Sequence, residues 1–121
     1  MRQTPSSRAR STSALGARAE RLVRWHYRLR GYRVLATNVR AGGNELDVVL
    51  RRGQRLVVCE VKSKRGPAYG DPVEAVGRTK ERRIRRAAEA WLATRPDLAV
   101  LDVSFEVAAV RGFLVRRVPL G

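Results

Sequence analysis

The sequence predicts an α/β protein in which helices flank a mixed β-sheet, in the order αβββαββ. Three observations predict this class: two segments with helical periodicity, five runs of β-favouring residues, and Gly or Pro at the boundaries between them. The chain has 121 residues, 44% of them hydrophobic, which is the length of one domain with enough apolar side chains for a core.

The N-terminal elements differ sharply in composition. Residues 1–13 contain three arginines and no acid, and they have too few apolar side chains to fold, so we expect a disordered basic arm there and one folded domain over residues 14–121. Leu15, Ala19, Leu22 and later apolar residues recur at helical spacing up to Gly31. This spacing predicts a helix over about residues 13–30.

The remaining elements follow from the same signals. Runs of β-favouring residues predict strands at 32–40, 45–51 and 55–63, with a turn at Arg52-Gly53. Asp71 as N-cap, Pro72 at the first helical position and Glu74 three residues after the cap predict a second helix, which ends before Pro96. Its apolar stripe is expected to pack on the sheet: Val73, Val76, Ile84, Ala87, Ala88 and Trp91. Two final strands are expected at 99–110 and 113–118.

Charge and composition restrict the classes of function. Lys and Arg number 26 against 11 Asp and Glu, a net charge of +15 that predicts a polyanionic partner. The chain has no apolar run of the ~20 residues that span a membrane and no signal-peptide pattern, so we expect a cytoplasmic protein without membrane contact. One cysteine and one histidine cannot form an intramolecular disulfide or a structural zinc site, and the chain lacks a Gly-rich phosphate loop and a zinc-protease motif. Among these kinds of active-site chemistry, only one based on carboxylate groups is left.

The carboxylates of two neighbouring strands are the candidate site. Side chains two residues apart in a strand share a face, so Glu45 and Asp47 point the same way. A two-residue loop at 52–53 would place Glu45 opposite Glu60 and Asp47 opposite Val58, all on one face. A three-residue loop would send the two groups to opposite faces, so the turn decides whether they converge.

Converging carboxylates would favour a divalent cation. Glu60 and Lys62 share a face of a strand that is otherwise apolar, and a Mg²⁺ or Mn²⁺ ion would relieve the repulsion between carboxylates. A lysine beside such an ion is typical of phosphodiester hydrolysis. The alternative is that Glu45 and Glu60 pair with neighbouring arginines on a solvated face.

Three segments carry a resemblance to a known family: Asn38-Val39-Arg40, Glu45-Leu46-Asp47-Val48-Val49 and Cys59-Glu60-Val61-Lys62. They resemble the PD-(D/E)XK nuclease core, and in detail the small YraN-like bacterial family, related by fold to Holliday-junction resolvases. The resemblance runs from about Leu15 to Val118. It implies a restriction-endonuclease-like fold and, by analogy with the resolvases, a homodimer.

The resemblance also implies roles for individual residues. Asp47 and Glu60 would be metal ligands and Lys62 the catalytic lysine. Glu20 matches a helix glutamate that completes the metal site in resolvase-like relatives, and Glu45 matches a further family glutamate. The chain departs from the family pattern in carrying Ala19 and Asn44 in place of glycines.

The second helix and the loop before it are the predicted nucleic-acid surface. Six cations fall between Arg78 and Arg86 against one acid, Glu81, which is unusually one-sided for a solvated helix face. Such contacts fix position without reading sequence, so binding should be structure-selective or non-specific and steeply salt-dependent. The candidate contact residues are Lys64, Arg65, Tyr69, Arg78, Lys80, Arg82, Arg83 and Arg86. The aromatic residues Trp25, Tyr27, Tyr32 and Trp91 are expected to pack in or beside the core instead.

Three functions fit these features. The first is a metal-dependent endonuclease acting on DNA, including branched or junction structures. The second is a non-catalytic DNA-binding protein of nuclease fold that acts in repair, recombination or uptake. The third is an RNA- or ribosome-associated basic protein, which would tolerate loss of Asp47, Glu60 and Lys62.

Overall fold

The computed structural model describes residues 6–63 and 72–120, with side chains over 16–63 and 77–120. The predicted contacts Lys64, Arg65 and Tyr69 and the predicted cap Asp71 lie outside the described residues. The order of elements confirms the predicted αβββαββ fold. The elements are α1 (Ser6–Arg28), β1 (Arg33–Ala41), β2 (Asn44–Arg52), β3 (Arg55–Ser63), α2 (Pro72–Ala93), the short 3₁₀ helix η1 (Pro96–Leu98), β4 (Asp102–Arg111) and β5 (Leu114–Pro119).

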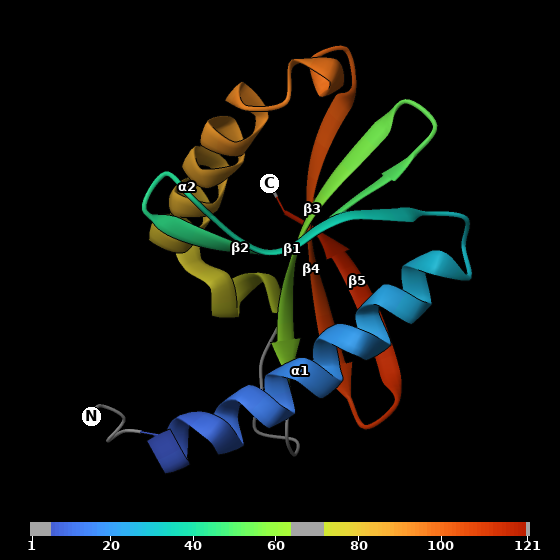
Figure 1. The fold of residues 1–121 in the computed structure, drawn as a ribbon. Helices are drawn as coiled ribbons and strands as arrows, with labels where there is room; N and C mark the ends of the chain where they lie inside the picture. The colour runs from blue at the N-terminus through green and yellow to red at the C-terminus, as the bar shows by residue number, and fades with distance from the viewer. Residues whose placement is uncertain (1–5, 64–71, 121) are drawn as a thin grey trace.

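The five strands form one mixed sheet in the order β1-β2-β3-β4-β5. Strands β3 and β4 are parallel, and the other neighbouring pairs are antiparallel. The parallel pair follows from the connection, because α2 carries the chain back along the sheet before β4 begins. Helices α1 and α2 lie on opposite faces of the sheet (Figure 1). Neither helix, over the residues described, has an apolar stretch that could cross a membrane.

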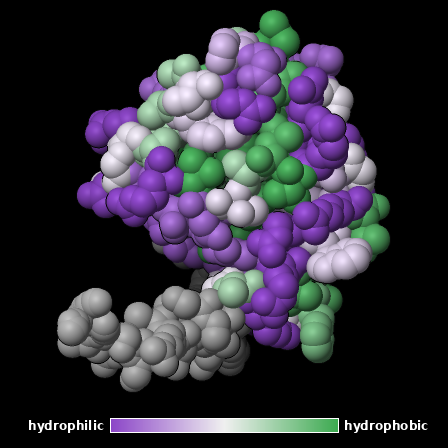
Figure 2. Space-filling model, in the orientation of Figure 1, coloured by the Kyte–Doolittle hydropathy of each residue, from purple (hydrophilic) through white to green (hydrophobic). Residues whose placement is uncertain are grey.

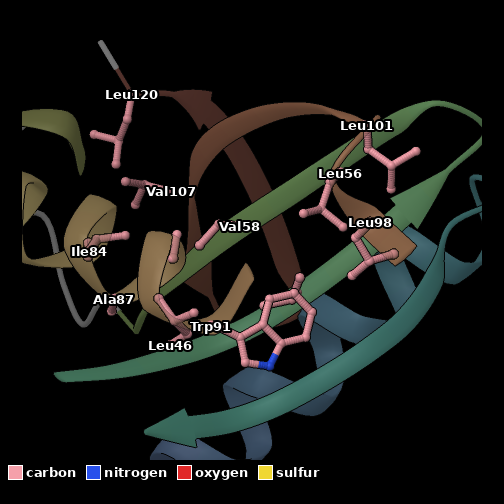
Figure 3. Packing of buried hydrophobic residues seen from close by; sticks show 12 residues of the cluster. Leu46, Leu56, Val58, Ile84, Ala87, Trp91, Leu98, Leu101, Val107 and Leu120 are labelled. Atoms are coloured by element: carbon pink, nitrogen blue, oxygen red, sulfur yellow. The ribbon is translucent and has the colours of Figure 1, made fainter. Parts of the chain in front are cut away.

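Each face of the sheet has its own hydrophobic cluster. On the α1 face, Ala19, Val23 and Tyr27 recur every four residues and pack against alternate residues of the central strands. On the α2 face, Ile84 and Trp91 of α2 belong to a larger cluster of buried residues (Figure 3). The predicted inward stripe of α2 is confirmed for its described members: Ile84, Ala87, Ala88 and Trp91 are buried.

Two helix predictions need correction. Helix α1 begins at Ser6, so residues 6–13 of the predicted disordered arm are helical; no Gly or Pro interrupts that stretch after Pro5. Helix α2 is kinked, because Gly77 has a φ of 74° and a ψ of 160° inside it. Only glycine adopts such a backbone readily, so this residue separates the first turn from the arginine-rich part.

The three hairpins turn on two residues each, and glycine comes first in every turn. Gly42, Gly53 and Gly112 have φ values of 57°, 60° and 60°, which L side chains rarely adopt. The predicted turn at Arg52-Gly53 is wrong by one residue. Arg52 pairs with Arg55, so the turn is Gly53-Gln54, with glycine at the left-handed position.

Replacing Gly42 with Ala is expected to destabilise the protein more than replacing Gly43. Both residues have positive φ, so both variants pay a similar backbone cost of ~1 kcal/mol. A Cβ at Gly42 would lie 3.2 Å from the carbonyl oxygen of Arg86 in α2, whereas a Cβ at Gly43 meets nothing within 4 Å. We expect an additional loss of about 1 kcal/mol for Gly42→Ala in urea unfolding. Equal losses would show that the turn does not pack against α2.

Candidate functional site

The candidate site lies where the regular pairing of β2 with β3 ends. Val48 pairs with Cys59, and one step further the backbone N–H of Val61 donates a hydrogen bond of 2.8 Å to Oδ2 of Asp47. A side chain therefore replaces the backbone ladder at this point. The expected pairing of Asp47 with Val58 is wrong because the turn is displaced by one residue, but the expected convergence holds: the register continues to place Asp47 beside Glu60.

The sheet is distorted around Asp47 on its other side as well. Continuing the β1–β2 register places Asn38 opposite Asp47, and Asn38 has a φ of 51°, the one positive φ outside glycine among the described residues. Leu46 and Val48 belong to clusters on different faces of the sheet, so the alternation of β2 is interrupted between them. Asparagine tolerates this backbone better than other non-glycine residues, which is the only sequence signal for the distortion.

Glu20 is tied to the same distortion. Its position beside the buried Ala19 leaves it at the margin of the α1 stripe, where Nδ2 of Asn38 donates a 3.2 Å hydrogen bond to Oε1 of Glu20. Its charge is close enough to raise the pKa of Asp47. The structure thus brings the predicted helix glutamate near the site, with Asn38 as its direct partner.

Glu60 is a buried carboxylate with a lysine partner. Its strand β3 is buried from Leu56 to Glu60, and Nζ of Lys80 on α2 lies 3.0 Å from Oε2 of Glu60. Although partial burial opposes it, this contact with Glu60 raises the pKa of Lys80 above its ordinary value. The sequence placed Lys80 on the nucleic-acid surface and missed this ion pair, because β3 and α2 meet only in the folded chain.

Lys62 lies on the same face of β3 as Glu60 and is half-buried. Partial burial and the neighbouring ammonium of Lys80 lower the pKa of Lys62, while the charges of Glu60 and Asp47 oppose this effect. Two lysines and two carboxylates therefore interact in one place. A lysine with a lowered pKa gives up its proton more readily than an exposed one.

A cavity of about 330 Å³ opens over this group between the sheet and α2. Asp47 and Glu60 line its inner part, and the predicted ligand Glu45 lines it as an exposed side chain. Arg83 and Lys80 close it from α2. The cavity therefore has carboxylates on the sheet side and cations on the helix side.

Asp47 is the carboxylate whose ionised form is most disfavoured at this site. Burial, followed by the negative charge of Glu60, raises the pKa of Asp47 to about 7. The hydrogen bond from Val61 lowers it, and the charges of Glu20 and Glu45 raise it further. A carboxylate of this kind is stabilised by any nearby cation.

Asp47 and Glu60 are the residues that could hold a metal ion. Over the described residues, no group of three or more His, Cys, Asp or Glu side chains is placed to bind one. Two carboxylates still suit Mg²⁺, which commonly keeps water and phosphate oxygens as its other ligands. The ammonium of Lys80 now supplies the positive charge beside Glu60, so the donor set fits a cation at this position.

The predicted arginine surface of α2 is present beside the cavity. Arg78, Arg82, Arg83 and Arg86 are exposed. Arg85 behaves differently, since it pairs with Glu81 at 3.0 Å and lies over the ring of Phe105. The solvent-facing cations of α2 thus lie next to the carboxylate cavity.

The fold and the site define a class of protein: a mixed sheet between two helices, with an acidic pair and two lysines at the sheet end beneath a basic helix. The profile of the uncharacterised protein family UPF0102 matches residues 19–110. The chain belongs to this family, which is the YraN-like family.

Relatives in several bacteria support the membership. A UPF0102 protein of Chelativorans sp. is 40% identical over 105 residues, which cover 87% of this chain and 81% of the relative. A UPF0102 protein of Acidothermus cellulolyticus is 41% identical, with 84% of each chain covered. One from Frankia alni is 42% identical over 112 residues, with 93% of this chain and 88% of the relative covered. The similarity therefore includes the strands and helices that build the cavity.

Proposed function

We propose that this protein is a metal-dependent endonuclease that hydrolyses DNA phosphodiester bonds, including those of branched or junction DNA. The observation that carries the proposal is the position of Asp47 in a cavity beside Glu60, close enough to Lys62 for their charges to interact, with Lys80 and the exposed Arg83 lining the same cavity. Buried like charges are costly, and their retention in a cavity is typical of a functional site. The resemblance to the PD-(D/E)XK core, which contains the same residue types at this spacing, supports the assignment.

Each residue has a distinct role in the proposal. Asp47 and Glu60 would hold the cation, and the Val61 N–H keeps the Asp47 carboxylate oriented. A Mg²⁺ or Mn²⁺ ion at this site supplies Lewis acidity and lowers the pKa of water. Lys62 would stabilise charge that develops on a phosphoryl oxygen, and the 3.0 Å contact of Lys80 would open when the cation takes its place beside Glu60.

The arginines of α2 would hold the DNA backbone over the cavity. Contacts to phosphate are sequence-independent and release counterions, so affinity should fall steeply with salt. A cytoplasmic location, where both DNA and Mg²⁺ are accessible, belongs to the same proposal.

Cleavage of labelled single-stranded, duplex, flapped and four-way-junction DNA tests the function. We expect the wild type to cut at least one substrate with Mg²⁺ or Mn²⁺ and none with EDTA. Glu60→Gln should lower the rate about 100-fold or more, the effect of losing one charge-stabilising group. Binding, measured in the same samples, should persist in this variant.

A non-cleaving DNA-binding protein is the second candidate. The ion pair between Lys80 and Glu60 favours it, because a lysine already neutralises one of the two carboxylates. If the wild type binds these substrates and cuts none of them with either metal, the endonuclease proposal fails and this candidate replaces it.

A further inference from the structure

An exposed aromatic groove lies on the face opposite the cavity. Trp25 of α1, Leu29 directly after this helix, and Phe113 and Leu114 of the β4–β5 hairpin line a groove of about 360 Å³. Trp25 is 59% exposed and Phe113 is 81% exposed, which is unusual for side chains of this size. Figure 2 shows hydrophobic side chains exposed between hydrophilic ones on the surface that includes α1.

The exposure of Trp25 corrects a prediction. Tyr27, Tyr32 and Trp91 pack as expected, but Trp25 does not. It lies two residues from both Val23 and Tyr27, which is about 200° around a helix, so it points away from the sheet that they contact. Helical spacing alone therefore assigns Trp25 to the outer side of α1.

The groove lies in an arginine-rich part of the surface. Between residues 16 and 30 the chain has five arginines and one acid, Glu20, and residues 111–117 contain no acid. The guanidinium of Arg18 lies 5.0 Å from the centre of the Phe113 ring. Arg30 lines the groove itself. An occupant must therefore match both flat apolar surface and dense positive charge.

The groove and the cavity lie toward the same end of the sheet. Lys62 pairs with Ala109 across β3 and β4, and the hairpin turn that carries Phe113 begins only after Arg111. The cavity opens on the α2 face, whereas the groove lies on the α1 face. A nucleic-acid strand that leaves the cavity and passes around this end of the sheet would reach the groove.

We propose that the aromatic groove binds single-stranded nucleic acid, with bases stacked on Trp25 and Phe113 and phosphates held by the surrounding arginines. Unpaired bases supply flat apolar faces and the backbone supplies negative charge, which together match the groove. A second copy of this chain matches it poorly, because a twofold interface would place the same arginines against each other. The inference rests on the proposed function only in taking nucleic acid as the partner.

Binding in EDTA tests the groove separately from cleavage. We expect Trp25→Ala and Phe113→Ala each to weaken binding of a 12-nucleotide oligothymidylate about tenfold, as loss of one stacked base would. Affinity for a blunt duplex should change less than about twofold, because paired bases are not available to stack. Val100→Ala, which truncates another exposed apolar residue, should change neither affinity.

Fluorescence gives an independent readout. Trp91 is only 8% exposed, so quenching by the oligothymidylate should come from Trp25 and should vanish in Trp25→Phe. Equal losses of single-strand and duplex affinity, or no loss, would overturn the inference. Two other outcomes would overturn it as well. One is a change in the sedimentation coefficient of Trp25→Ala without DNA, which would identify a self-association surface. The other is a change in Trp25 fluorescence with phosphatidylglycerol vesicles but not with the oligothymidylate. If the wild type cuts no DNA but the groove variants still weaken single-strand binding as described, only the endonuclease proposal is contradicted.

Discussion

Replacing Asp47 with Asn is expected to stabilise the protein at pH 8 and to abolish metal-dependent cleavage. The folded protein holds this carboxylate with a pKa of about 7, against the ordinary 3.8, because it is buried and faces Glu60. At ~1.4 kcal/mol per pKa unit the difference sets a ceiling of about 4 kcal/mol on the cost of ionising it. Asn keeps an oxygen for the Val61 N–H and carries no charge. We expect a gain of about 1–3 kcal/mol in unfolding free energy and a loss of cleavage of about 1,000-fold.

The stability difference should depend on pH in one direction. Because the folded pKa of Asp47 is raised, the folded state binds the extra proton, and the wild type loses stability as the pH rises from about 4 to about 7. The advantage of Asp47→Asn should therefore be small at pH 4, intermediate at pH 5 and fully developed at pH 8. Urea unfolding at several pH values measures it.

Glu45→Gln is the matched control. It removes an exposed carboxylate that lines the same cavity, so stability should change by less than ~0.5 kcal/mol. Added Mg²⁺ should raise the melting temperature of the wild type and leave that of Asp47→Asn unchanged. An Asp47→Asn protein that is less stable than the wild type at pH 8 would show that the carboxylate is already neutralised in the fold.

Replacing Arg117 with Met is expected to cost about 3 kcal/mol of stability. Arg117 on β5 donates two hydrogen bonds to Glu106 on β4, from Nε at 2.9 Å and Nη2 at 3.2 Å. Tyr27 of α1 donates a third to the same carboxylate. Although burial raises the pKa of Glu106, these partners hold it below its ordinary value. Without Arg117 the buried carboxylate has lost its counter-charge, which typically costs ~3–5 kcal/mol.

The double variant isolates the charge from the packing. Glu106→Gln combined with Arg117→Met should recover part of the loss, because Gln still accepts the Tyr27 hydroxyl and leaves no charge buried. Arg116→Met, the same change at the neighbouring exposed position of β5, should alter stability by less than ~0.5 kcal/mol. A loss at Arg117 no larger than at Arg116 would mean that water already solvates Glu106.

Part of the candidate site could be predicted from local pattern. The period-two spacing of Glu60 with Lys62 is a property of β3 itself, and a two-residue turn gives a β2–β3 register that brings Asp47 beside Glu60. The interrupted alternation of β2 at Asp47 could not be read from the same spacing. The predicted turn is displaced by one residue, but its length of two residues is correct. The carboxylates of the two strands therefore still meet, as predicted. No local sequence pattern indicates the contacts between distant segments, which are Lys80 with Glu60, Asn38 with Glu20, and Glu106 with Arg117.

The sequence by itself determined the order of elements, the apolar stripes, the strong positive charge and the identity of the carboxylates, because each follows from local periodicity or composition. Only the tertiary structure decided which charges meet. It seated Lys80 on Glu60, distorted β2 at Asp47 and left Trp25 and Phe113 together at the surface. The physical reason is that charge interactions and burial depend on distances between segments far apart in the chain, which folding alone sets.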